Sequence, residues 1–549
     1  MFSLHVIFIR SITLLPQLIP YEVNPVMKSR YSVFMLTLVL FLFAPVLITA
    51  QTTSLVFGMV ATPDVTLKPL ELNQRDIVSV LNLIYEGLFR VDDNYLPQPN
   101  LAYSFEFSNE GRRLIVTLRD NVTFHNGTML TSADVVATLD KMYELSGFDK
   151  DLNSEVPMEN RGLYYSTFYY IRNWSAQDDH TIIFTLRRAC YGSLYALTFP
   201  VLPAEEVDML TPAGTGPYKY DGYEQGSSIW LSMNTRWWQK APQIRNIRAS
   251  IYSDSEKVLT AFDQRDIDIA TTRSINASRY TGSLSSFSMN ARSRQLEVLL
   301  VNRAYSLFQS DDSGNNLVRQ AVSYAIDRSV LINSIYQGMA TVAYTPIPSG
   351  IWLSNEGTTK DIYDPMMASS LLDRAGWKLA DNGKRYKNGQ SMPQLRLYVY
   401  DEPNSMVRTN AANKIREQLE NVGFSVNVVT WNRDSVITKL RSGDFSLALC
   451  AFNFDVCPDP GFTITSTGSC NFTRYRSNTM NDLLTDLRKS WVQDDYRNVM
   501  NQIQDLFIKD MPYIPLYWRS SALLSRSAFT NTRDIRELEL LRGIESFTD

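Results

Sequence analysis

The feature that most constrains the fold is an apolar run that ends in a tight turn, from Gly443 to Phe462. Within it, apolar residues recur at every second position, and most residues between them are also small or apolar (Phe445, Leu447, Leu449, Ala451). Such a run is typical of a strand buried on both faces, as strands are in α/β sheets. The strand should stop at Asp455, because the sequence Pro-Asp-Pro-Gly at 458–461 enforces a turn.

Two roles are compatible with the position of Asp455. The carboxyl ends of strands in open α/β sheets face the ligand crevice, which would place Asp455 at the mouth of a cleft. Among Phe452, Phe454 and Phe462 a carboxylate loses hydration and needs a cation or hydrogen-bond donors, and a ligand ammonium would serve. Alternatively, Asp455 only caps the turn by accepting backbone N–H bonds. The residues alone favour neither role.

Length and composition exclude several classes of protein. A chain of 549 residues is too long for one core and predicts two or three domains. The hydrophobic share of 44% is that of a globular protein, so disorder is not expected. The net charge of −4 comes without a block of Lys or Arg, which argues against nucleic acid as a partner. The 29 Tyr, 26 Phe and 9 Trp offer large contact surfaces to a ligand.

The N-terminal residues have the pattern of an export signal. Lys28 and Arg30 precede an apolar run from Val33 to Ile48, and small residues follow up to Ala50, where cleavage is expected. The run is short for a membrane span, which needs roughly 20 residues. An uncleaved anchor stays open, because the residue three before the cut is isoleucine. Translation from Met27 rather than Met1 also stays open.

Cysteine and histidine are too few and too scattered for a metal site. The four cysteines have no zinc-motif spacing (Cys190, Cys450, Cys457, Cys470), and only His125 and His180 lie outside the first 50 residues. No metal and no cofactor are therefore expected. In an oxidising compartment Cys457 and Cys470 are placed to close a small loop beside Asp455, and whether they do stays open.

Periodicity predicts alternating strands and helices along the chain. The expected strands are 54–61, 103–107, 114–118, 298–302, 395–400 and 425–430, and the expected helices are 77–88, 131–143, 317–337 and 410–422. Hairpins are expected at 103–118, around the turn Asn109-Glu110-Gly111, and at 378–390, where two Asn-Gly pairs mark the turns. The order of strand 395–400, helix 410–422 and strand 425–430 predicts a right-handed parallel unit.

Six motifs in order along residues 55 to about 520 resemble the family 5 extracellular solute-binding proteins of ABC importers, which include oligopeptide, dipeptide and nickel binders. The motifs are YEGLFR with the following LPQPNLAYSFEF…TSADVV, GTGPYK, SIWLSMNTRWW…RDIDIA, LVRQAVSYAIDR, GDFSLALCAFNFDVCPDP and NFTRYRSNTMNDLL. A single motif would be weak, whereas six in the right order are specific.

The resemblance implies an α/β fold of the two-lobed, periplasmic-binding-protein-like class II type, with an extra subdomain inserted in the first lobe. The expected division is 1–50 for upstream residues and a signal peptide or anchor, 51–85 for the first part of lobe I, 86–205 for the inserted subdomain, 206–290 for the second part of lobe I, 291–505 for lobe II and 506–549 for the return to lobe I. Two crossings between the lobes would let them hinge about a crevice.

The resemblance also implies a role for Asp455. It lies where oligopeptide binders of this family carry the aspartate that pairs with the ligand's α-amino group. Some of them carry an arginine six residues earlier that binds a short peptide's carboxylate, but Leu449 stands there in this chain. The aromatic residue three before the aspartate is Phe452. A peptide held at both ends is therefore in doubt, whereas backbone pairing to an extended ligand needs no arginine.

Other lining residues are expected at the ends of strands and at the GTGPY turn. No Lys-Ser or Lys-Thr follows GTGPY, so it is not a nucleotide cradle, and its glycines instead permit a close chain crossing. Tyr218 then either faces the cleft or belongs to the core. Five more residues have the same two alternatives, ligand contact or packing: Trp431, Tyr85, Glu86, Asn453 and Tyr517. Phe452 and Phe454 complete the expected set around Asp455.

The leading functional hypothesis is an exported substrate-binding protein that captures oligopeptides or a related solute and delivers them to a membrane permease, as a monomer. A membrane-anchored solute sensor or an oligosaccharide-binding protein on the same fold is the alternative. An exported hydrolase is disfavoured, because the chain has no Gly-x-Ser-x-Gly or His-Glu-x-x-His motif. The protein is therefore expected not to be an enzyme.

Overall fold

The computed structural model describes residues 54–62, 66–72, 74–149, 163–310, 315–358, 362–402, 405–527 and 535–546. The expected signal peptide, anchor and alternative start lie outside these residues. Among the described residues, no helix has the length and apolar character needed to cross a bilayer. The same residues bring no group of three potential metal-ligating side chains together.

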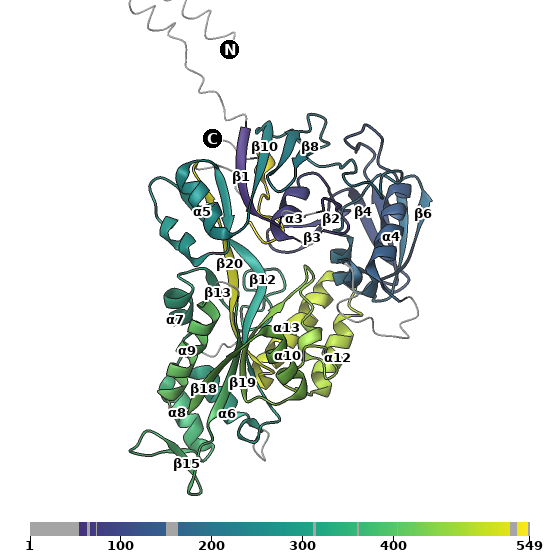
Figure 1. Cartoon of the computed structure of the whole chain (residues 1–549). Helices are drawn as coiled ribbons and strands as arrows, with labels where there is room; N and C mark the ends of the chain where they lie inside the picture. Colours follow the sequence, from purple (N-terminus) through teal and green to yellow (C-terminus); the bar gives the residue numbers. More distant parts are fainter. Residues whose placement is uncertain are drawn as a thin grey trace, which may run out of the picture. The chain divides into compact units, whose positions relative to one another are not determined.

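One mixed sheet of eleven strands forms the centre of the fold (Figure 1). Its order is β18 (Val426–Trp431), β17 (Leu395–Tyr400), β19 (Leu447–Asn453), β12 (Phe287–Val301), β20 (Ile514–Ser525), β11 (Ile269–Thr272), β1 (Ser54–Val60), β10 (Asn246–Tyr252), β9 (Ser228–Met233) and β8 (Tyr218–Glu224), with β13 (Ala340–Val342) paired to β20. The core strands β19 and β1 are apolar on both faces because helices and loops cover them.

Two long antiparallel strands, β12 and β20, run side by side through the middle of this sheet (Figure 1). At one end β12 pairs with β19, and at the other β20 pairs with β11. Their ladder has register shifts between Arg292 and Leu296 and between Glu297 and Val298. The two strands are the expected crossings, and β12 begins well before the predicted strand 298–302.

The two ends of the sheet are covered by different helices. The β1 end carries α3 (Arg75–Leu81), α5 (Ser255–Gln264) and the short helix η5 (Ile275–Tyr280). The β19 end carries α6 (Leu317–Tyr324), α8 (Pro365–Arg374), α9 (Val407–Glu420), α10 (Arg433–Ser442), α12 (Asn478–Leu487) and α13 (Gln493–Asp510). Strands β17 and β18 are parallel and joined by α9, which confirms the predicted strand–helix–strand unit.

A second sheet of four antiparallel strands lies within residues 102–186. Its order is β4 (Ala102–Ser108), β5 (Arg113–Leu118), β7 (Thr181–Leu186) and β6 (Ile171–Asp178), and α4 (Ser132–Ser146) packs on it. The hairpin of β4 and β5 and the N-cap at Thr131 confirm the sequence predictions. The domain boundaries drawn from the sequence stay predictions.

The remaining elements are short. They are β2 (Phe89–Val91), β3 (Pro97–Pro99), β14 (Lys378–Leu379), β15 (Arg385–Lys387), β16 (Gln390–Ser391), α7 (Arg328–Val330), α11 (Gly461–Ile464), η3 (Tyr165–Tyr169), η4 (Tyr191–Leu197), η6 (Ser306–Phe308), η7 (Leu331–Ile335) and η8 (Ile544–Ser546). Strands β14, β15 and β16 confirm the hairpin predicted at 378–390.

Two predicted helices are shorter than expected. Helix α3 ends at Leu81, because the carbonyl oxygens of Leu83 and Ile84 accept bonds from a distant segment instead of from the next helical turn. The predicted helix 317–337 is broken into α6, α7 and the π-helical turn η7, and Asp327 caps the second piece by accepting from the N–H of Val330 at 3.1 Å.

All four cysteines are free thiols in the structure, so the disulfide considered between Cys457 and Cys470 is contradicted. The Cys457 sulfur accepts a hydrogen bond from the Tyr170 hydroxyl at 3.3 Å and is buried. Burial raises the pKa of the Cys457 thiol above its usual range. A buried thiol with a raised pKa is a poor nucleophile for exchange.

Candidate functional site

A cleft of about 410 Å³ lies where four segments of the chain meet. Its wall is built from the chain around and after α3 (69–100), the stretch of η3 and η4 (163–200), the junction of β12 and β19 (Arg294, 455–457) and the C-terminal segment (536–545), together with Pro217, Trp237 and Gln239. Three of the residues predicted from the sequence line it: Asp455, Tyr85 and Glu86.

Asp455 stands two residues beyond the end of β19 on the cleft wall. Its Oδ2 accepts from the Ser166 hydroxyl at 2.7 Å, and its Oδ1 accepts from the N–H of Val456 at 2.7 Å. The Arg294 guanidinium lies 3.5 Å from Oδ1. The side chain is 55% exposed, so a long ion pair of this kind contributes little to stability. Asp455 therefore caps its own turn and still presents a carboxylate to the cleft.

The last residues of β19 before Asp455 extend beyond its ladder with β17. The ladder with β17 ends at Leu449, four residues before the strand does. Phe454 donates its N–H to the carbonyl of Arg294 at 2.9 Å, so the backbone groups of the preceding residue, Asn453, point away from β12. Asn453 is exposed at this edge, although its side chain does not line the cleft.

Glu86 is a buried carboxylate in the cleft wall that is held by neutral donors. Its Oε2 accepts from Trp238 at 2.9 Å, from Thr215 at 3.0 Å and from Trp237 at 3.3 Å, and its Oε1 accepts from Asn100 at 3.4 Å. Burial raises the pKa of Glu86, and these donors offset only part of that effect. Glu86 thus fixes the pair of tryptophans behind the cleft, a role that its sequence context did not indicate.

The GTGPY turn makes the close crossing that the sequence predicts. An added Cβ at Gly214 would lie 1.9 Å from the carbonyl oxygen of Ile84, and one at Gly216 would lie 2.4 Å from that of Leu83. The N–H groups of Gly216 and Tyr218 donate to these same carbonyls at 2.9 and 3.0 Å. Only glycine leaves room for this approach.

Tyr218, by contrast, does not face the cleft. It is fully buried, and its hydroxyl donates to the carbonyl of Ile244 at 3.1 Å. The alternative that Tyr218 belongs to the core is therefore correct. Its neighbour Pro217 lines the cleft instead.

His125 bridges to the same turn. Its Nε2 lies 3.0 Å from the carbonyl of Gly216, and the N–H of Gly214 donates to its Nδ1 at 3.3 Å. An Nδ1 that accepts a hydrogen bond requires a neutral ring. Burial lowers the pKa of His125 to about 4, in agreement with this arrangement. His125 therefore fastens two distant segments together.

Four of the predicted aromatic residues lie outside the cleft wall. Phe452 and Phe454 are buried and pack edge-on against Phe462. Tyr517 is fully buried against Tyr336. Trp431 is 40% exposed and packs on Tyr398, and Tyr85 lines the cleft but donates its hydroxyl to the carbonyl of Pro212. Phe452, Phe454, Tyr517 and Trp431 therefore pack in the core or at its edge, against neighbouring aromatic rings.

Sequence reasoning missed the polar residues that reach the cleft from distant segments. Ser166 and Arg294 contact Asp455 from 289 and 161 positions away. The C-terminal segment was expected to return to the first lobe, but nothing in its sequence indicated that Glu537 would enter the cleft wall.

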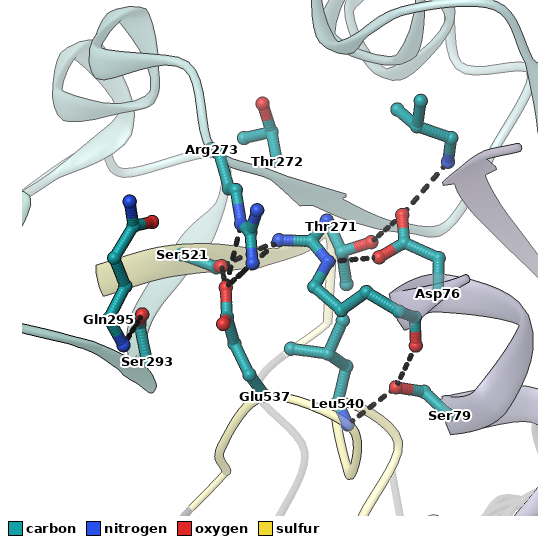
Figure 2. A network of polar contacts seen from close by, with 12 residues as sticks. Asp76, Ser79, Thr271, Thr272, Arg273, Ser293, Gln295, Ser521, Glu537 and Leu540 are labelled. Atoms are coloured by element: carbon teal, nitrogen blue, oxygen red, sulfur yellow. Dashed lines mark hydrogen bonds and ion pairs between the residues drawn. The ribbon is translucent and has the colours of Figure 1, made fainter. Parts of the chain in front are cut away.

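Glu537 belongs to a network of charges at the carboxyl ends of β1 and β11 (Figure 2). Its Oε1 accepts from Arg273 at 2.7 Å, from Ser521 at 2.8 Å and from Arg75 at 3.3 Å. Burial alone would raise the pKa of Glu537, but the two guanidinium groups outweigh it and hold the pKa below its usual value. The carboxylate is thus kept ionised.

A family model of the bacterial extracellular solute-binding proteins, family 5, matches residues 97–474. The chain belongs to this family. This confirms the resemblance drawn from the six motifs. Known proteins with a similar sequence support the assignment over a larger part of the chain.

The chain is 25% identical over 481 residues to Protein XP55 of Streptomyces lividans, covering 84% of this chain and 82% of that protein. It is 24% identical over 475 residues to the oligopeptide-binding protein AppA of Bacillus subtilis, covering 80% and 81%. The crystal structure of that AppA with a nonapeptide superposes with a TM-score of 0.62, at 21% identity, over 90% of this chain and 99% of AppA. The likeness confirms the expected two-lobed α/β fold.

Proposed function

We propose that this family 5 solute-binding protein captures oligopeptides, or a related solute, in the cleft and passes them to a membrane permease of the ABC type. The observation that carries the proposal is Asp455, a half-exposed carboxylate on the cleft wall at the end of a buried strand. AppA, which resembles the chain along most of its length, is named for binding oligopeptides. Capture requires no covalent chemistry, and we propose that the protein is not an enzyme.

The ligand's amino end is assigned to Asp455. An ammonium group there forms a charge-assisted hydrogen bond with the carboxylate and replaces the long contact from Arg294, which is 3.5 Å away. From Asp455 the peptide extends along the cleft wall. A cleft of about 410 Å³ holds a short peptide together with bridging water, and this arrangement tolerates different side chains.

The working form of the protein follows from the same assignment. We propose an exported monomer, either free outside the cytoplasmic membrane or tethered there by residues 28–50. The intact mass of the protein recovered from its host separates the two forms, because retention of residues 28–50 adds their mass. Native mass spectrometry of the same sample reports both the oligomeric state and any solute that copurifies.

Asp455→Asn tests the assignment. Peptides with a free amino end should lose about tenfold to a hundredfold in affinity, since a hydrogen bond to a charged group contributes about 1.5–3 kcal/mol, whereas N-acetylated peptides should lose much less. Isothermal titration calorimetry measures both. Asp482→Asn, on the exposed face of α12, is the matched control. Equal losses for free and acetylated peptides would remove Asp455 from this role.

A further inference from the structure

The Glu537 network has the composition of a carboxylate-binding site that is already filled by a side chain of the protein. Two guanidinium groups and one hydroxyl converge on a single carboxylate oxygen, at distances of 2.7–3.3 Å. Glu537 itself lines the cleft, and its side chain is 6% exposed. Arginine and hydroxyl donors of this kind suit any carboxylate, whether it belongs to the chain or to a solute.

Two of the three donors, Arg75 and Ser521, have contacts that do not involve Glu537. Arg75 also bonds to Asp76 at 2.5 Å, and Asp76 in turn accepts from the N–H of Val60 at 2.9 Å and from Thr271 at 3.3 Å (Figure 2). Arg75 donates to Ser521 at 2.7 Å. Arg75 and Ser521 therefore keep their positions when the carboxylate is exchanged, which lowers the cost of binding a new one.

The Glu537 side chain can leave without moving its own segment. Its backbone N–H donates to the carbonyl of Arg292 at 2.7 Å, which fixes the main chain against β12. The neighbouring Arg536 donates to the carbonyl oxygens of Val91 and Asp92, and Leu540 is fully buried. Only the side-chain torsions of Glu537 have to change, and Arg273 is already 51% exposed.

The network and Asp455 lie beside the same strand. Arg292 pairs with Arg536 in a parallel bridge, and Arg294 contacts Asp455. Two residues along a strand span about 7 Å, close to the length of two extended peptide residues. A short peptide whose amino end is bonded to Asp455 therefore reaches toward the network with its other end.

We propose that Arg75, Arg273 and Ser521 form a subsite for the carboxylate end of a short peptide, and that Glu537 occupies this subsite until the peptide displaces it. This rests on the proposed function, because it assigns the second end of the peptide bound at Asp455. The subsite would give the peptide's carboxylate a partner in this chain, which has Leu449 where some oligopeptide binders of the family carry an arginine.

Chemical rescue tests the subsite without any peptide. Glu537→Ala removes the internal carboxylate, and propionate should then raise the midpoint of thermal unfolding more than propionamide does at equal ionic strength. Adding Arg273→Gln to the variant should abolish the difference, whereas adding Arg172→Gln, an exposed arginine of β6, should leave it. Equal effects of propionate and propionamide on Glu537→Ala would overturn the proposal.

Isothermal titration calorimetry with matched peptides tests whether the subsite binds the carboxylate end of a peptide. The ratio of affinities for a free-acid peptide over its C-terminal amide should rise about tenfold in Glu537→Gln and fall toward one in Arg273→Gln. Glu106→Gln, an exposed glutamate of β4, should keep the wild-type ratio. A ratio in Glu537→Gln equal to the wild type would overturn the subsite while leaving the proposed function intact. If all variants failed to bind peptides, the proposed function would fail and the propionate experiment would still decide whether the subsite exists.

Discussion

Glu86 and Glu537 line the same cleft and are both buried, but the pKa values of their carboxyl groups are shifted in opposite directions. Four neutral donors surround Glu86, and burial raises the pKa of its carboxyl. Two guanidinium groups surround Glu537, and they hold its pKa below the usual value despite burial. At Glu86 the neutral donors do not offset the loss of hydration, whereas at Glu537 the two guanidinium groups do.

The difference separates a structural carboxyl from an exchangeable one. Glu86 connects the cleft wall to Thr215 and to both tryptophans, so removing it leaves several buried donors without a partner. Glu537 bonds to Arg273 and to two groups that keep other partners, since Arg75 also bonds to Asp76 and Ser521. We therefore expect substitutions at Glu86 to change stability and substitutions at Glu537 to change binding.

The largest effect is expected for Glu86→Ala. The free energy of unfolding should fall by about 4 kcal/mol, because the buried hydroxyl of Thr215 and the partly buried N–H groups of Trp237 and Trp238 lose their acceptor. Urea unfolding followed by tryptophan fluorescence measures this. Glu106→Ala should stay within about 0.5 kcal/mol of the wild type. A loss at Glu86 as small as this control would contradict its structural role.

His125 supports the same part of the cleft wall as Glu86, because its partners Gly214 and Gly216 flank Thr215, which bonds to Glu86. With a folded pKa of about 4, the ring stays neutral in the folded state while the unfolded state takes up a proton below about pH 6.5. Stability should therefore fall by about 3 kcal/mol from this source as the pH drops from 6.5 to 4. His125→Gln should flatten this slope in urea unfolding at several pH values, and His180→Gln should not. An unchanged slope in His125→Gln would contradict the neutral ring.

The smallest effect is a difference in sign between two Glu→Gln variants. Ionised Glu537 contributes to the free energy of unfolding above its unfolded pKa, and this contribution is lost as the pH falls through its lower folded pKa. Glu537→Gln should therefore lower the free energy of unfolding by about 1–2 kcal/mol at pH 7 and by less at pH 4. Protonated Glu86 contributes fully to the free energy of unfolding below its unfolded pKa, and this contribution is lost as the pH rises through its higher folded pKa. Glu86→Gln should therefore lower the free energy of unfolding less at pH 7 than at pH 4. Parallel pH profiles of the two variants would end the distinction.

The parts of the site that the sequence predicts are those set by local chemistry. The alternating apolar run before Asp455 and the turn after it correctly give β19 and its end. The run left the role of Asp455 open, and in the structure this residue both caps its turn and lines the cleft. The glycines at 214 and 216 correctly give a close crossing, because the missing side chains leave room for another backbone. The direction of Tyr218 was not determined by the glycines, and it points into the core.

The parts that escaped prediction are set by contacts between residues far apart in the chain. Glu537 meets Arg273 and Arg75 across 264 and 462 positions, and no local pattern marks a glutamate that will find two arginines. Helix α3 ends early for the same reason, since Leu83 and Ile84 bond to residues 216 and 218. Periodicity shows which residues are apolar. The Glu537 network and the end of α3 depend instead on which distant segment of the chain packs beside them.

The irregular ladder between β12 and β20 lies beside both ends of the proposed peptide site. The register shift falls between Arg292 and Leu296, so the strand deviates from regular geometry at the residues that adjoin both carboxylates, Asp455 and Glu537. Any flexing of this ribbon alters the spacing between the two ends of a bound peptide. In the proposed complex, the twist of this one stretch of backbone is therefore coupled to the length of the peptide that fits.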